Sequence, residues 1–158
     1  MTTKQKTRSL PIAESASQID QSKLLGLLGY NCRRAYLVIF ALFRERLAEL
    51  ELGPVEYSVL ILIRDNPRIN QKTLAKALGI DPPNMATLLD RLEKREILAR
   101  VKNPEDQRVR LLELTSIGKK TCTAAEKIVV QLEVDASPNL TDRERKELIR
   151  LAQKIFCS

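Results

Sequence analysis

The sequence predicts a mainly α-helical protein with one small β-hairpin, which places it in the α+β class. Apolar residues recur three or four positions apart through most of residues 23–155, the spacing of helices that bury one face. Two short β-prone runs, 98–102 and 109–114, flank a segment rich in turn-forming residues. A length of 158 residues suits one domain, or a small lobe with an attached helical element.

The N-terminal third is predicted to be an arm followed by one long helix. Residues 1–22 are rich in Thr, Ser, Gln and Lys, which predicts a mobile arm. Residues 23–52 are expected to form a single helix, because apolar side chains recur near helical spacing at Leu24, Leu28, Ala35, Ile39, Leu42, Leu47 and Leu50. Gly53 and Pro54 close this helix and open the next, since glycine favours helix ends and proline favours first turns.

Three shorter helices are predicted next. The first directs Val55, Val59, Leu60 and Ile63 toward a core and ends at Asn66-Pro67. The second, 71–78, has Asn70 as its N-cap and Gly79 as the following turn. The third begins at Asp81, which precedes two prolines, and its inward face carries Met85, Leu88, Leu89 and Leu92. The second and third of these helices, joined by a glycine turn, form a helix-turn-helix.

A hairpin and two further helices complete the chain. The loop at 103–107 joins the two β-prone runs and places Arg108 and Arg110 at or near the hairpin tip. A basic hairpin directly after a helix-turn-helix predicts a winged helix-turn-helix over residues 54–115. Thr115 is expected to cap a helix to about Ala136 with Ile117, Cys122, Ala125, Ile128, Val129 and Leu132 inward, and Thr141 with Glu144 to start the last helix as a capping box.

Composition narrows the classes of function. Hydrophobic residues make up 44% of the chain and charged residues 30%, which favours a folded protein. The net charge of +7 favours polyanionic partners such as nucleic acid or an anionic membrane surface. The longest apolar stretch, 35–43, is far shorter than the roughly 20 residues that span a bilayer, and the N-terminus lacks a signal-peptide core, so a cytoplasmic protein is expected.

The chain has no histidine, which removes the commonest general base and the commonest zinc ligand. It also lacks a Gly-rich phosphate loop, so we do not expect an enzyme, a metal or a cofactor. The three cysteines, Cys32, Cys122 and Cys157, are far apart and odd in number, unlike the framework of a disulfide-rich secreted domain.

Four segments carry a resemblance to a known family: Leu74-Ala-Lys-Ala-Leu-Gly-Ile-Asp-Pro82, Leu88-Leu-Asp-Arg-Leu-Glu-Lys-Arg95, Asn103-Pro-Glu-Asp-Gln-Arg108 and Leu114-Thr-Ser-Ile-Gly118. With them the sequence resembles the MarR family of bacterial transcription regulators from about Leu24 to the end. The resemblance implies that Arg108 enters the minor groove of DNA and that Asp106 holds it or a neighbouring arginine. This chain has Glu96 where the family usually has glycine, Gln107 in place of a common arginine, and Pro83 and Ala86 where small hydroxyl residues are frequent.

The resemblance also implies a homodimer. Its interface would be a dimerisation region made of residues 23–53 and 116–158, whose long apolar faces agree with that role. Two recognition helices and two wings would then read half-sites of a pseudo-palindrome about 10 bp apart, or a multiple of that spacing.

Seven residues are candidates for contact with duplex DNA. The outward face of the third short helix carries Asn84, Thr87 and Arg91, which suit the major groove or adjacent phosphates. Lys72 suits a phosphate, and the wing contributes Asp106, Arg108 and Arg110. For the helix residues the alternative is an ordinary solvated face, which is common for surface lysine above all.

The resemblance to this family also implies a small-molecule effector. Members of the family typically release DNA when a ligand enters a crevice near the dimerisation helices. Aromatic rings and guanidinium groups gather in the first two helices, a combination that suits an aromatic carboxylate or its coenzyme A thioester. The candidate ligand residues are Tyr30, Arg33, Arg34, Tyr36 and Tyr57. The sequence thus predicts a repressor released from its operator by such a compound; the alternative for these residues is dimer packing with surface arginines.

Two other functions stay open at this point. Cys32 and Tyr36 lie four residues apart on one helical face, a spacing similar to that of the peroxide-sensing branch of the same family. Arg33 and Arg34 would favour a reactive thiolate, although a lone cysteine is more often inert packing. The chain could also be an architectural protein that binds all duplexes alike, which a comparison of specific and competitor DNA distinguishes.

Overall fold

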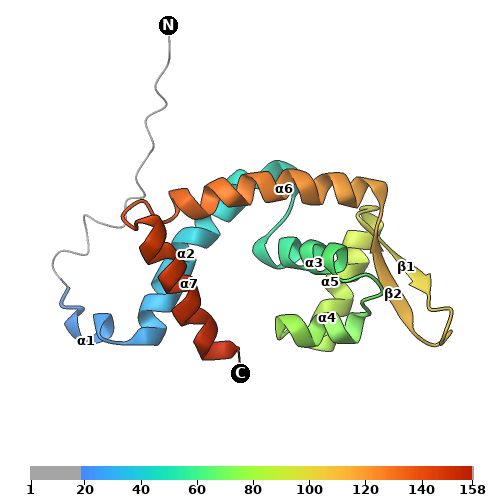
Figure 1. Ribbon diagram of the computed structural model, residues 1–158, viewed down its shortest axis with the longest axis horizontal. Helices are drawn as coiled ribbons and strands as arrows, with labels where there is room; N and C mark the ends of the chain where they lie inside the picture. Colours follow the sequence, from blue (N-terminus) through green and yellow to red (C-terminus); the bar gives the residue numbers. More distant parts are fainter. Residues whose placement is uncertain (1–18, 158) are drawn as a thin grey trace, which may run out of the picture. The chain divides into compact units, whose positions relative to one another are not determined.

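A computed structural model describes residues 19–157, and these divide between Tyr36 and Leu37 into two units that are described separately. The helices are α1 Ser22–Leu25, α2 Leu28–Arg46, the 3₁₀ helix η2 Ala48–Leu50, α3 Pro54–Asp65, α4 Gln71–Leu78, α5 Pro82–Lys94, α6 Ser116–Asp135 and α7 Asp142–Phe156; the strands are β1 Leu98–Lys102 and β2 Arg110–Leu114 (Figure 1). Residues 1–18 of the predicted arm lie outside the described residues. In the part of the chain that is described, no helix is long and apolar enough to cross a membrane.

The single helix predicted over residues 23–52 is wrong, because the chain breaks it twice. The first break separates α1 from α2, and the side-chain amide of Asn31 donates to the carbonyls of Leu25 and Leu27, both at 2.8 Å. At the second, the chain turns through η2 and Glu51 adopts a left-handed conformation with φ 48°. That turn buries both Leu47 and Leu52, which a continuous helix would place on different faces.

One apolar core unites α3 to α6 with the hairpin, so the predicted winged lobe is built around a shared interior. Its most deeply buried side chains are Leu47, Val59, Leu60, Leu74, Met85, Leu89, Leu92, Leu98, Leu112, Cys122 and Leu132. Two residues expected to face inward do not: Val55 is 41% exposed and Ile117 is 49% exposed. Each is the second residue of its helix, where the first turn extends beyond the packed face.

The helix-turn-helix forms as the sequence predicts. The Asn70 side chain accepts the backbone N–H of Thr73 at 3.0 Å and caps α4. Gly79 follows α4 with φ 61°, and the N–H of Ile80 reaches back to the carbonyl of Ala75 at 3.0 Å. This left-handed position favours glycine and turns the chain directly into α5.

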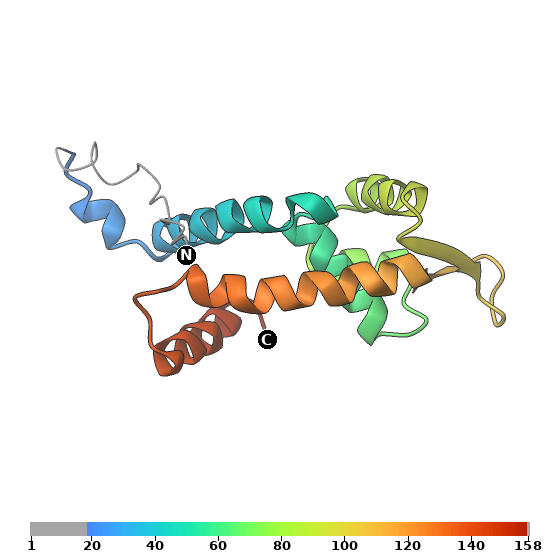
Figure 2. The same ribbon diagram turned by 90° about the horizontal axis from the view of Figure 1, so that it is seen from above.

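The predicted wing is confirmed as an antiparallel hairpin, with β2 starting one residue later than expected. Leu98 pairs with Leu114 at the base and Lys102 with Arg110 toward the loop. The hairpin is also attached to the link between α3 and α4, where the N–H of Leu112 donates to the carbonyl of Ile69 at 2.9 Å. It extends beyond the N-terminal end of α6 in both ribbon views (Figure 1, Figure 2).

Both C-terminal helices begin with the predicted caps. The Thr115 hydroxyl accepts the N–H of Gly118 at 3.0 Å at the start of α6. At the start of α7, the Thr141 hydroxyl accepts the N–H of Glu144, and the Glu144 carboxylate accepts the N–H of Thr141 at 2.8 Å. The Thr141 hydroxyl also donates to the Glu144 carboxylate at 2.7 Å, and this hydrogen bond, followed by the one from the Thr141 N–H, lowers the pKa of Glu144.

Candidate nucleic-acid interface

Helix α5 presents an exposed polar face on the side opposite its buried Met85, Leu89 and Leu92. Asn84 and Thr87 lie on this face, and the Thr87 hydroxyl donates to the carbonyl of Pro83 at 3.1 Å. Because Pro82 and Pro83 have no backbone N–H, Asn84 supplies the first N–H of the helix. The N-terminal end of α5 therefore offers a polar side chain and few backbone donors to an anion.

Arg91, one turn further along α5, pairs with a carboxylate of another helix. Its Nη2 contacts Oε1 of Glu56 in the first turn of α3, while the Arg91 side chain stays mostly exposed. The predicted contact of Arg91 with DNA would therefore require it to share or leave this partner.

The wing loop is ordered by its own side chains. Oδ1 of Asn103 accepts the N–H of Glu105 at 3.1 Å, and Oδ1 of Asp106 accepts the N–H of Arg108 at 2.9 Å. Val109 closes the turn by donating to the carbonyl of Asp106 at 3.0 Å. Asp106 thus holds the backbone at Arg108, whose guanidinium is exposed and has no ion-pair partner within residues 19–157. An arginine fixed at its backbone and free at its head suits entry into a narrow groove.

The base of the wing is tied to α5 by Arg100, a residue that sequence reasoning missed. Its guanidinium contacts Asp90 at 2.7 Å and also pairs with Glu93, and its backbone N–H reaches Glu93 at 3.3 Å. Asp90 and Glu93 lie three residues apart on α5, which was the only available signal. These contacts hold the wing and α5 in a fixed position relative to each other.

A second link that the sequence did not reveal joins the wing loop to the turn after α3. Arg68 has φ 72° in that turn, and its guanidinium lies 3.0 Å from the Glu105 carboxylate and 3.4 Å from Oδ1 of Asn103. The loop is thus held from the helical side as well as by its own turn.

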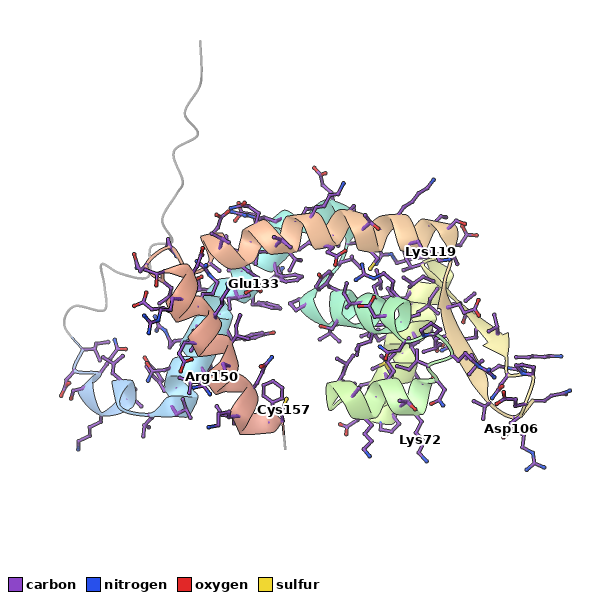
Figure 3. The ribbon with its side chains drawn as sticks, viewed as in Figure 1. Lys72, Asp106, Lys119, Glu133, Arg150 and Cys157 are labelled. Carbon is purple, nitrogen blue, oxygen red and sulfur yellow. The ribbon has the colours of Figure 1, made fainter. Side chains whose placement is uncertain are left out.

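The remaining DNA candidates are exposed. Lys72 lies in the first turn of α4, and Arg110 lies at the loop end of β2. In Figure 3, Lys119 is labelled on α6, and Lys72 and Asp106 lie on the side of the lobe away from that helix. Six of the seven candidates, all except Arg91, have exposed side chains without an ion pair inside the described chain.

The candidate ligand residues belong to both units, and each set is described by itself. In the first unit, Tyr30 donates its hydroxyl to Gln21 at 2.7 Å, and Arg33, Arg34 and Tyr36 are exposed on α2. In the second, the Tyr57 ring packs on Phe43 with ring centroids 5.8 Å apart. Burial, followed by the nearby Glu126 carboxylate, raises the pKa of Tyr57, so its phenol stays protonated at neutral pH.

The three cysteines differ in exposure. Cys32 on α2 and Cys157 after α7 are exposed, whereas Cys122 is fully buried. Burial raises the pKa of the Cys122 thiol, which disfavours the reactive thiolate. Among residues 19–157, no group of three His, Cys, Asp or Glu side chains is placed to hold a metal ion.

Comparison with known proteins gives consistent matches. The model of the MarR family matches residues 52–109. The chain is similar to the transcriptional repressor CouR bound to a 23-mer DNA duplex, with 36% identity, a TM-score of 0.83 and coverage of 88% of this chain and 99% of that one. CouR bound to p-coumaroyl-CoA matches at 34% identity and TM-score 0.79, over 89% and 100%. A putative transcriptional regulatory protein for the hcr operon of Thauera aromatica is 28% identical over 96% of this chain and 92% of its own length.

Proposed function

Because the chain belongs to the MarR family of transcriptional regulators, we propose that it is a repressor that binds duplex DNA as a homodimer and is released by an aromatic acyl thioester. The exposed guanidinium of Arg108, whose backbone is held by Asp106 at the tip of the wing, is the observation that carries the proposal. Arg108 thus offers DNA an exposed cation on a backbone that the wing turn holds in place.

In the DNA complex, α5 lies in the major groove with Asn84 and Thr87 toward base edges or nearby phosphates. Arg108 enters the adjacent minor groove, where a narrow groove concentrates negative potential. Arg110 and Lys72 contact phosphates on either side. The link from Arg100 to Asp90 and Glu93 keeps wing and helix in register, so both grooves are read together.

Dimerisation gives exposed apolar side chains a partner. On α6, Val130 and Val134 are exposed, and α7 exposes Leu148, Ile149, Leu151, Ile155 and Phe156. In the first unit, Leu24, Leu25, Leu27 and Leu28 are exposed as well. A second copy that covers these residues removes apolar surface that a lone chain leaves in water. The regions assigned to this interface are 23–53 and 116–158, with the DNA-binding lobe at 54–115.

The effector is an aromatic acid joined to coenzyme A. One of the two CouR structures is bound to p-coumaroyl-CoA, which belongs to the class of compound that the tyrosines and arginines of this chain suit. In the second unit, Tyr57 supplies a protonated phenol and a ring packed on Phe43. Taken by itself, the first unit supplies Arg33 and Arg34, whose guanidinium groups suit carboxylate or phosphate groups. Binding of the ligand shifts the dimer away from the spacing that fits the operator. A cytoplasmic location goes with this role.

A second candidate effector is an organic hydroperoxide. The exposed Cys32 thiol beside Arg33 favours it, since reactive thiols are accessible and lie near positive charge. In this function, oxidation of Cys32 would release the DNA.

Selected DNA and two effectors test the proposal. Duplexes chosen from a random pool by the native chain are expected to share a pseudo-palindrome, and p-coumaroyl-CoA is expected to weaken their binding by about 5- to 150-fold. Free coenzyme A is the control and should leave binding unchanged. If hydroperoxide alone releases the DNA and Cys32→Ser abolishes that release, the peroxide sensor replaces the thioester sensor. If the selected duplexes share no common sequence, the proposal that the chain is a sequence-specific regulator is contradicted.

A further inference from the structure

The carboxylate of Glu56 connects the start of α3 to the recognition helix α5. Oε2 of Glu56 accepts the backbone N–H of Gly53 at 3.2 Å, and Oε1 pairs with Nη2 of Arg91. The side chain of Glu56 is only 16% exposed, whereas that of Arg91 is 60% exposed. One end of the pair is therefore fixed in the lobe, and the other end is open to solvent.

Arg95, the C-cap residue four positions after Arg91, is held differently. Its guanidinium donates to the carbonyls of Glu51 at 2.8 Å and Leu50 at 2.9 Å, and only 26% of its side chain is exposed. Arg95 thus has two neutral backbone acceptors, and the exposed Glu51 carboxylate 3.4 Å away, which together hold the end of α5 to the turn before α3. Arg91 has one anionic partner and four further N–H groups available to another anion.

We propose that Glu56 is a built-in competitor for the DNA backbone: it holds Arg91 in the free protein and gives it up to a phosphate when DNA binds. This inference rests on the proposed function, because it assigns a role to a residue beside the same DNA-binding face. Glu56 is a positioning residue that acts through Arg91 and does not itself touch DNA.

The exchange is chemically balanced. When Arg91 leaves, Glu56 keeps the Gly53 N–H and its access to water, so no carboxylate is buried without a partner. Arg91 exchanges one oxyanion for another, and the guanidinium fork fits phosphate as well as carboxylate. Binding of any duplex therefore requires the ion pair between Arg91 and Glu56 to break. This cost lowers the affinity for DNA of every sequence.

Glu56→Gln tests the competition, because an amide oxygen can still accept the Gly53 N–H while the negative charge is lost. Affinity for a mixed-sequence duplex of about 30 bp, long enough for two half-sites, is expected to rise about two- to fivefold, the size of one partly exposed ion pair. The gain should be largest at low salt, where the pair is least screened. In an Arg91→Ala background the same substitution should give no gain.

Glu126→Gln is the matched control, since it also removes one negative charge from an arginine, Arg64, which lies on the α3–α6 contact and keeps its ion pair with Asp65. If it raises affinity as much as Glu56→Gln does, the gain is due to net charge and the proposal fails. It also fails if Glu56→Gln gives no gain, or gives the same gain without Arg91.

Arg91 supplies a second readout that does not depend on the stability of Glu56→Gln. Arg91→Ala is expected to reduce the slope of log affinity against log salt by about one, and an unchanged slope overturns the proposal. A failure here is distinct from failure of the proposed function. If only the competition by Glu56 fails, Arg108→Ala still weakens DNA binding. If the proposed function fails, the native chain itself does not bind the duplex.

Discussion

Replacing Gly118 with alanine is expected to destabilise the chain by about 3 kcal/mol, because the new methyl group has no room. A Cβ at this position would lie 1.9 Å from the carbonyl oxygen of Ile97, well inside any real contact distance. The neighbouring atom is backbone rather than the end of a flexible side chain. Relief would require the turn after α5 and the start of α6 to separate.

That junction is held by several hydrogen bonds that the separation would disturb. The carbonyl of Ile97 accepts the N–H of Thr115 at 3.2 Å, and the Thr115 hydroxyl donates to the carbonyl of Glu96 at 2.5 Å. Glu96 itself has φ 55°, a left-handed conformation that glycine adopts more readily than glutamate. The glycine of the Leu-Thr-x-x-Gly pattern therefore lies where two backbone segments approach closely at the base of the wing.

Urea unfolding of Gly118→Ala measures the effect, and Gly29→Ala is the matched control. Gly29 lies in α2, where a Cβ meets nothing within 4 Å. Alanine there should be neutral, or stabilising by up to about 1 kcal/mol through helix propensity. Equal stability of Gly118→Ala and the native chain would show that this junction is not closely packed.

Replacing Arg108 with alanine is expected to weaken binding of the selected operator by at least about tenfold, with a salt slope reduced by about one. The guanidinium is exposed and contacts no carboxylate in the described chain, so its loss should not change folding. Its effect should appear only when a polyanion is present. The measurement is an anisotropy titration of the labelled duplex at two salt concentrations.

Lys119→Ala provides the control for loss of one positive charge. Lys119 is exposed in the first turn of α6, on the other side of the lobe from Lys72 (Figure 3). It should change operator affinity little. If Arg108→Ala and Lys119→Ala have equal small effects, the wing does not enter the minor groove.

Local signals predicted most of the lobe. Asn70 and Gly79 act within a few residues of themselves, as N-cap and left-handed turn, so the helix-turn-helix was visible in the sequence. The same holds for Thr115 and for the capping box at Thr141. The prediction of one long N-terminal helix was wrong, because the spacing of apolar residues does not reveal a turn that buries both Leu47 and Leu52.

The candidate interface was less visible, because its positions depend on distant partners. The outward position of Arg91 on α5 makes it a candidate, but its pairing with Glu56, 35 residues away, has no local signal. Arg95 likewise contacts carbonyls 44 and 45 residues before it. Asp106 is the opposite case, since its hydrogen bond to the N–H of Arg108 spans only two residues.

The ratio of specific to non-specific DNA affinity tests the central claim most directly. The native chain should bind the selected pseudo-palindrome at least about 10³-fold more tightly than an unrelated duplex of equal length at physiological salt. It should bind as a dimer, with affinity that falls as salt rises. Equal affinity for both duplexes would contradict a sequence-reading regulator and would favour an architectural DNA-binding protein.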